Sequence, residues 1–192
     1  YYFQRMQEVA SSAAMRTTAQ LGILRCSYYT NNIAATIEVA TRLIEQENLA
    51  EDIRQEAIYC RAKSHLKEKQ YGLAIVDLTP ISKEVRTIIG AEAKYELANC
   101  YFQLGAIDMA EQEVMSFMQM QTTQQYWLAK SMILLADINL QRNDTFQAKQ
   151  YLLALQANYK QTDDIQTIVA EKLAALETTK EETPELEEED TL

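Results

Sequence analysis

Hydrophobic positions along this chain recur at helical spacing rather than in the alternation typical of strands. Three times, a small residue is followed twelve positions later by an alanine that opens the next apolar stretch: Ala62 and Ala74, Ala98 and Ala110, Ala136 and Ala148. A weaker copy places Gly22 ahead of Ala35. Small residues let two antiparallel helices approach closely, so each copy predicts a pair of amphipathic helices joined by a short turn.

The pattern predicts four such pairs between residues 11 and 162. They are expected at 11–28 with 32–47, 51–68 with 71–84, 87–104 with 107–121, and 124–142 with 144–160. Residues 1–10 are predicted to be the end of a repeat cut by the start of the chain. Pro80 removes a backbone donor and therefore predicts a kink or break at 78–80.

A last helix is predicted at 163–178. One face of it carries Ile165, Ile168, Val169, Leu173 and Leu176, and such a stripe suits a helix that caps the final pair. Residues 179–192 are predicted to be a disordered acidic tail, because they cannot bury enough apolar surface to offset the entropy of ordering.

Composition supports an all-α fold. The 192 residues include only 4 Gly and 2 Pro, too few for the frequent turns of a sandwich or barrel. No apolar run reaches about 18 residues, so no membrane-spanning segment is predicted. The net charge is -10, but seven acidic and no basic residues lie between Glu181 and Asp190, which leaves the rest at only -3. A body with so little charge is not expected to bind nucleic acid.

The repeats resemble a known family. Leu97-Ala98, Tyr101, Gly105, Ala110 and residues 56–78 resemble tetratricopeptide repeats, and 144–149 followed by Leu152 resemble the repeats of bacterial envelope-associated members. The resemblance covers about residues 12–162 and implies a right-handed α-α superhelix, an all-α solenoid. The chain departs from the family at three positions, where Arg61, His65 and Asn139 replace apolar or aromatic residues.

The resemblance also implies a function, because such solenoids bind a partner protein or peptide in a concave groove. The family's groove positions correspond here to Tyr59, Lys63, Lys67, Tyr95, Asn99, Phe102, Gln103, Lys130, Ile133, Asp137 and Gln141. A mixture of aromatic and polar residues suits a protein partner. We therefore expect a scaffold or adaptor, although the same positions are also compatible with packing between repeats or with solvation.

Residues that could carry catalysis are sparse. His65 is the only histidine and stands where the family has a core aromatic, so a structural role is predicted. Cys26, Cys60 and Cys100 have no CxxC spacing and are predicted to be small buried hydrophobes. We expect no enzyme activity, metal or cofactor.

Two other functions are alternatives to a scaffold. An RNA-binding helical repeat would need a basic groove, and a helical-bundle enzyme would need an inward cluster of ionisable groups. For the compartment, the resemblance favours the periplasm of a bacterial envelope. Three unpaired cysteines favour a reducing cytoplasm, which stays open as the alternative.

Overall fold

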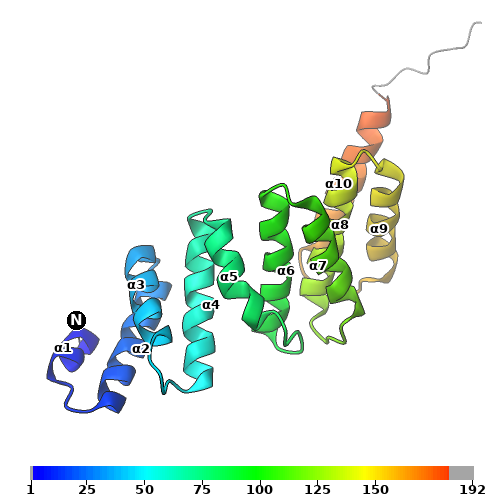
Figure 1. Cartoon of the computed structure of the whole chain (residues 1–192). Helices are drawn as coiled ribbons and strands as arrows, with labels where there is room; N and C mark the ends of the chain where they lie inside the picture. The colour runs from blue at the N-terminus through cyan, green and yellow to red at the C-terminus, as the bar shows by residue number, and fades with distance from the viewer. Residues whose placement is uncertain (1, 182–192) are drawn as a thin grey trace, which may run out of the picture. The chain divides into compact units, whose positions relative to one another are not determined.

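A computed structural model describes residues 2–181, with side chains described as far as residue 178, and this part of the chain contains ten helices and no strand (Figure 1). The helices are α1 (Tyr2–Val9), α2 (Ala13–Tyr29), α3 (Ile33–Ile44), α4 (Glu51–Lys67), α5 (Tyr71–Ile81), α6 (Ile88–Gln103), α7 (Ile107–Gln119), α8 (Gln125–Gln141), α9 (Thr145–Asn158) and α10 (Ile165–Glu181). The predicted all-α fold is confirmed, and the helices begin and end within a few residues of the predicted ranges. The superhelical arrangement stays a prediction.

The helices form two compact units, one of α1 to α7 and one of α8 to α10. Within each unit, every helix packs on the next helix in the chain. The small residues of the repeat lie where paired helices meet, and Ala62, Ala74, Ala98 and Ala110 are all buried in the first unit. This placement agrees with the reason given for them, since only a small side chain allows the two backbones to approach.

The same turn joins the helices of each pair. Its left-handed residue is Asn31, Lys69, Gly105 or Asn143, with φ of 58°, 56°, 74° and 62°. In each case the next residue's N–H reaches back five residues to a carbonyl of the ending helix, as when Asn32 N donates to Ser27 O at 2.8 Å. This geometry satisfies the last carbonyls of the helix. Of these four residues, Gly105 is the one whose type most strongly predicts a left-handed turn from the sequence.

The sequence predicted a kink or break at 78–80, but α5 is not broken there. The helix continues through Pro80 and ends at Ile81, short of the predicted end at residue 84. Proline in the last turn removes only one backbone bond, and the N–H of Ser82 still reaches the carbonyl of Leu78 at 2.9 Å. Pro80 thus shortens the helix and starts the connection to α6.

In the second unit, α10 packs on α8 and α9. Ile165, Val169 and Leu173 of α10 are buried against α8 and α9, and Ile168 and Leu176 pack at the edge of the same core. The backbone of α10 remains helical to Glu181, past the predicted end at residue 178. The rest of the predicted acidic tail, 182–192, lies outside the described residues.

Among the helices of residues 2–181, none is both long enough and apolar enough to cross a membrane. This finding agrees with the absence of an apolar run in the sequence.

Candidate functional site

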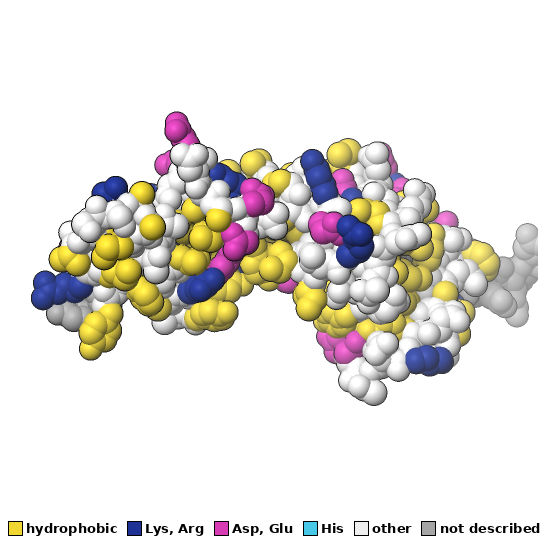
Figure 2. Space-filling view, turned by 90° about the horizontal axis from the view of Figure 1, so that it is seen from below, with side chains coloured by type: hydrophobic (Ala, Val, Ile, Leu, Met, Phe, Trp, Pro, Cys, Tyr) yellow, Lys and Arg dark blue, Asp and Glu magenta, His cyan; other side chains and the backbone are white. Residues whose placement is uncertain are grey.

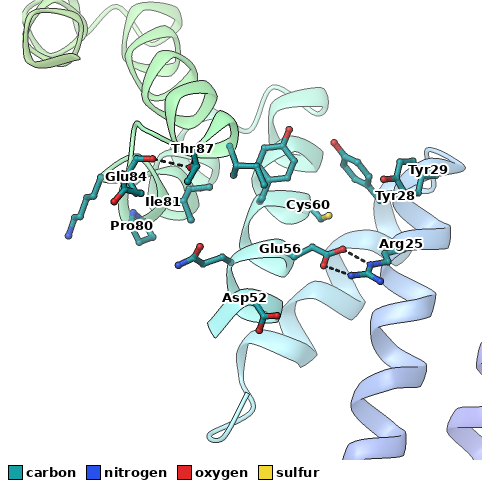
Figure 3. A pocket seen from close by; sticks show the side chains of 15 residues that line it. Arg25, Tyr28, Tyr29, Asp52, Glu56, Cys60, Pro80, Ile81, Glu84 and Thr87 are labelled. Atoms are coloured by element: carbon teal, nitrogen blue, oxygen red, sulfur yellow. Dashed lines mark hydrogen bonds and ion pairs between the residues drawn. The ribbon is translucent and has the colours of Figure 1, made fainter. Parts of the chain in front are cut away.

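A cleft of about 530 Å³ opens over α4 in the first unit. Its floor is the outward face of α4, one side is the end of α2, and the other side is the connection from α5 to α6 (Figure 3). It is lined by Arg25, Tyr28, Tyr29, Asp52, Gln55, Glu56, Tyr59, Cys60, Pro80, Ile81, Lys83, Glu84, Thr87, Ile89 and Gly90. Hydrophobic side chains, with a few acidic and basic ones between them, also occupy the face of this unit seen in Figure 2.

Helical periodicity builds the floor. Asp52, Glu56 and Tyr59 follow one another at spacings of four and three residues, which places them on one face of α4. Cys60 lies beside them and is buried. Burial, reinforced by the nearby carboxylate of Glu56, raises the pKa of the Cys60 thiol to about 12. The floor therefore presents a neutral thiol at neutral pH.

Three tyrosines give the cleft its aromatic character. The rings of Tyr28 and Tyr29 meet edge to face with centroids 5.7 Å apart, and Tyr28 lies 6.5 Å from Tyr59. The hydroxyl of Tyr59 donates a hydrogen bond to Glu92 Oε2 at 2.8 Å, and burial together with this bond raises the pKa of Tyr59. Tyr29 differs from the other two because 83% of it is exposed. The rings of Tyr28 and Tyr59 are thus fixed by packing, and the ring of Tyr29 is accessible to a partner.

The charges of the cleft are partly neutralised within the unit. Arg25 donates to both carboxylate oxygens of Glu56 at 2.6 and 2.7 Å (Figure 3). Arg86 holds Glu84 in the same way at 2.8 Å, and these bonds lower the pKa of Glu84 to about 2. Asp52 and Lys83 make no hydrogen bond or ion pair with any residue that the structure describes. The cleft therefore offers one uncompensated negative and one uncompensated positive charge.

The start of α6 fixes the wall opposite the tyrosines. Thr87 caps this helix, because its Oγ1 accepts from Gly90 N at 3.0 Å and donates to Glu84 O at 3.0 Å. A Cβ at residue 90 would overlap the carbonyl of Glu84, so only glycine allows the connection to fold back this tightly. The shape of the cleft depends on that close approach.

The predicted groove residues of α4 have different surroundings. Tyr59 lines the cleft. Lys63 Nζ is paired with Glu92 at 2.7 Å and Glu96 at 3.0 Å, so it joins α4 to α6. Burial lowers its pKa, but the two carboxylates outweigh that effect and the pKa of Lys63 is raised. Lys67 is exposed and donates to Asn31 Oδ1 at 2.7 Å. Lys63 is thus an inter-helix contact, the alternative left open from the sequence.

The predicted groove residues of α6 lie outside the cleft. Tyr95, Asn99 and Phe102 are half-buried, and Gln103 is exposed. Gln103 Nε2 lies 3.4 Å from Asn99 Oδ1, as donor and acceptor of a long hydrogen bond. None of the four lines the cavity over α4.

The prediction for α8 needs correction. Ile133 is only 6% exposed and belongs to the apolar core of the second unit, so we remove it from the candidate surface. Asp137 is paired with Lys172 of α10 at 2.5 Å. Lys130 is half-buried and Gln141 is exposed. The family pattern places these residues on an open face, but α10 packs on α8 and covers part of it.

His65 has the packed position that was predicted. It is buried in α4, with Nδ1 2.8 Å from Gln70 Oε1. Its neighbour Arg61 binds both carboxylate oxygens of Asp77 on α5, at 2.6 and 2.9 Å. The two unusual residues of α4 therefore belong to one polar contact between paired helices.

The prediction for the cysteines is right for two of the three. Cys60 and Cys100 are buried, and burial with nearby Glu96 raises the pKa of Cys100 to about 12 as well. Cys26 is exposed, which corrects the prediction. It lies in the degenerate first copy of the repeat, where the pattern set the register of α2 only weakly.

Sequence reasoning found Tyr59 but missed the rest of the cleft. The signal available was the pair Tyr28-Tyr29 directly before the turn at Asn31, since two adjacent tyrosines on a helix cannot both face the core. Neither a scan against protein-family models nor a search of curated proteins gives a match to this chain. Function must therefore be argued from the geometry.

Proposed function

We propose that this protein is a non-enzymatic scaffold or adaptor, a tetratricopeptide-like solenoid that binds a protein or peptide partner on the face of α2, α4 and α6. The observation that supports it best is the cleft over α4, with three adjacent tyrosines along one side. Its volume of about 530 Å³ lies in the range of sites that enclose small ligands or a few side chains.

Tyr29 is the residue on which binding should depend most. Tyrosine is enriched among the residues that dominate binding energy, because its large rigid ring loses little entropy on contact. Tyr28 packs edge to face against this ring, and Tyr28 in turn lies against Tyr59, whose hydroxyl is bound to Glu92. The site is therefore largely preformed, and this lowers the entropy lost when a partner binds.

The chemistry of the cleft also favours contact over reaction. The Glu56 carboxylate is occupied by Arg25, and the Tyr59 hydroxyl by Glu92. The Cys60 thiol is kept protonated by a pKa of about 12. A nucleophile or general base needs a group that is both free and able to accept a proton, whereas Glu56 and Tyr59 are engaged by partners and the Cys60 thiol is protonated.

Photo-crosslinking from the cleft tests this proposal. A photoreactive phenylalanine at position 29 should form a crosslink to a specific partner in cells that make the protein, and mass spectrometry would identify it. With the purified partner, Tyr29→Ala should then weaken binding by about 2 kcal/mol, some thirtyfold in Kd, as for an interface hot spot.

The matched control is Phe146→Ala. Phe146 is an aromatic residue of similar exposure, 73%, on α9 in the other unit. It should leave the affinity within about twofold of the original. Equal losses from both substitutions, or from neither, would place the binding surface elsewhere.

A further inference from the structure

The charges around the cleft over α4 point to the chemistry of its occupant. Resting on the proposed function, we propose that this cleft takes a peptide segment in which an apolar side chain stands between a basic and an acidic residue. The apolar side chain fills the cavity, the basic residue pairs with Asp52, and the acidic residue pairs with Lys83.

The apolar part of the proposal rests on the middle of the cleft. Tyr59 and Cys60 on α4 line the cavity together with Ile81 and Ile89. Ile89 is 44% exposed although it lies next to buried residues of α6. Covering such surface with an apolar side chain removes it from water and is favourable in proportion to the area buried.

The charged part rests on which groups already have partners. Five charged residues line the cleft, and three of them are occupied: Arg25 by Glu56, Glu56 by Arg25, and Glu84 by Arg86. Within the described part of the chain, this leaves Asp52 and Lys83 without an ion-pair partner. A complementary occupant would therefore carry one charge of each sign, not a net positive or negative charge.

The two charges also impose a direction on the peptide. Asp52 lies in the first turn of α4, and Lys83 lies in the connection between α5 and α6. A peptide that binds in the same chain direction with its charge order reversed would therefore bring like charges together at both ends. Like charges opposed at a binding surface discriminate against the wrong partner even where the matching pair adds little affinity.

The test uses the full chain and a panel of short fluorescein-labelled peptides. Each peptide has Leu at its centre, with Arg and Glu on either side at a set of spacings, in both orders, and a third form has Gln at both places. Fluorescence anisotropy gives each Kd. At one spacing, one charge order should bind about three- to tenfold more tightly than the other, the size expected for two exposed ion pairs.

Charge reversal on the protein makes the test specific. The double variant Asp52→Lys, Lys83→Glu should invert the preference for charge order. The control Glu38→Arg, Arg42→Glu exchanges another exposed ion pair, on α3, outside the cleft lining, and should leave the preference unchanged. Replacing the central Leu by Gln should weaken every peptide, by about tenfold or more, if it fills the apolar cavity.

Three results would overturn the inference. They are no peptide binding at about 1 mM, equal affinity for both charge orders at all spacings, or a preference that the double reversal does not invert. Failure here is distinct from failure of the proposed function. If the crosslinked partner still depends on Tyr29 but not on Asp52 or Lys83, the cleft binds a protein of different chemistry.

Discussion

Both units have buried apolar cores, but they differ in the charged contacts between their helices. In the first unit, charged groups on α4 reach the next two helices: Arg61 pairs with Asp77 on α5, and Lys63 pairs with Glu92 and Glu96 on α6. In the second unit, α10 is held on α8 and α9 mainly by aliphatic side chains such as Ile165, Val169 and Leu173. Its pairs Lys172–Asp137 and Lys149–Glu177 lie nearer the surface.

This difference separates stability from specificity. Apolar burial is favourable for many arrangements of similar shape, whereas a buried ion pair is tolerated only where both partners meet. The ion pairs of α4 therefore fix its position relative to α5 and α6. The cleft over α4 depends on that position. The unit with the buried ion pairs, the first unit, is therefore also the one that carries the candidate site.

The largest expected effect comes from breaking the buried pair in the first unit. Asp77→Ala leaves Arg61 without its bidentate partner in a largely buried place and should destabilise the fold by about 3 kcal/mol. Chemical denaturation gives the magnitude. Hydrogen exchange resolved by peptide should show faster exchange in α4 and α5.

A compensating variant sharpens the same experiment. Arg61→Met with Asp77→Leu removes both charges at once and should recover most of the lost stability, because an apolar pair of similar volume often replaces a buried ion pair without cost. If the double variant is as unstable as Asp77→Ala, removing the unpaired guanidinium does not restore stability, and the loss of its contact with Thr41 offsets the gain.

The second unit should respond to lost apolar volume. Leu173→Ala truncates a side chain that is 7% exposed and should cost about 2 kcal/mol, from lost burial and the cavity left behind. Faster hydrogen exchange should be concentrated in α10 and α9. Leu153→Ala, at an exposed leucine of α9, is the control and should cost less than about 0.5 kcal/mol. Similar losses from both would mean that α10 is not packed by this stripe.

A smaller effect is expected at the glycine behind the cleft. Gly90→Ala places a methyl group against the carbonyl of Glu84 and should cost about 1 kcal/mol even after the gain in helix propensity. Gly72→Ala is the matched control, since nothing lies near its Cβ position and it too is helical. That change should stabilise the protein by about 0.5 kcal/mol. Thermal melting of the two variants in opposite directions would confirm the close approach.

The sequence predicted the apolar contacts of the second unit better than the charged contacts of the first unit. All five residues of the α10 stripe were placed correctly, because helical spacing of aliphatic residues has one common explanation in a repeat protein. Arg61 was recognised only as a departure from the family. Its partner Asp77 lies on the next helix, and periodicity does not say which of several charges a guanidinium will meet.

The candidate site shows the same limit. Tyr59 was predicted, but Tyr28 and Tyr29 lie at the end of the degenerate repeat, and the opposite wall comes from an irregular connection after Pro80. The position of that wall depends on the cap at Thr87 and on the close approach of Gly90 to Glu84. Neither contact can be identified from residue spacing alone. Ile133 failed for a related reason, because a capping helix covers a face that a further repeat would leave open.

The smallest perturbation is thiol labelling, which measures how often the buried cysteines of the first unit become accessible to a reagent. Cys26 is exposed and should react with a disulfide reagent at pH 8 at the rate of an accessible thiol. Cys60 and Cys100 are buried in α4 and α6, the helices joined by Lys63, and each has a pKa of about 12. They should react more slowly by a factor of about a thousand or more, because both opening and ionisation are then required.

Alkaline pH then distinguishes ionisation from opening. Folding raises both pKa values above the ordinary thiol value of about 8.5, so the stability that these protonated thiols contribute is complete below that pH and is lost as the pH rises toward about 12. Labelling of Cys60 and Cys100 should therefore accelerate steadily over this window. Lys63→Met removes the ion pairs between α4 and α6 and leaves the hydrogen bond from Tyr59 to Glu92, and it should accelerate both thiols at pH 8 while leaving Cys26 unchanged. Equal rates for all three cysteines in the original protein would show that the polar contacts do not hold the first unit closed.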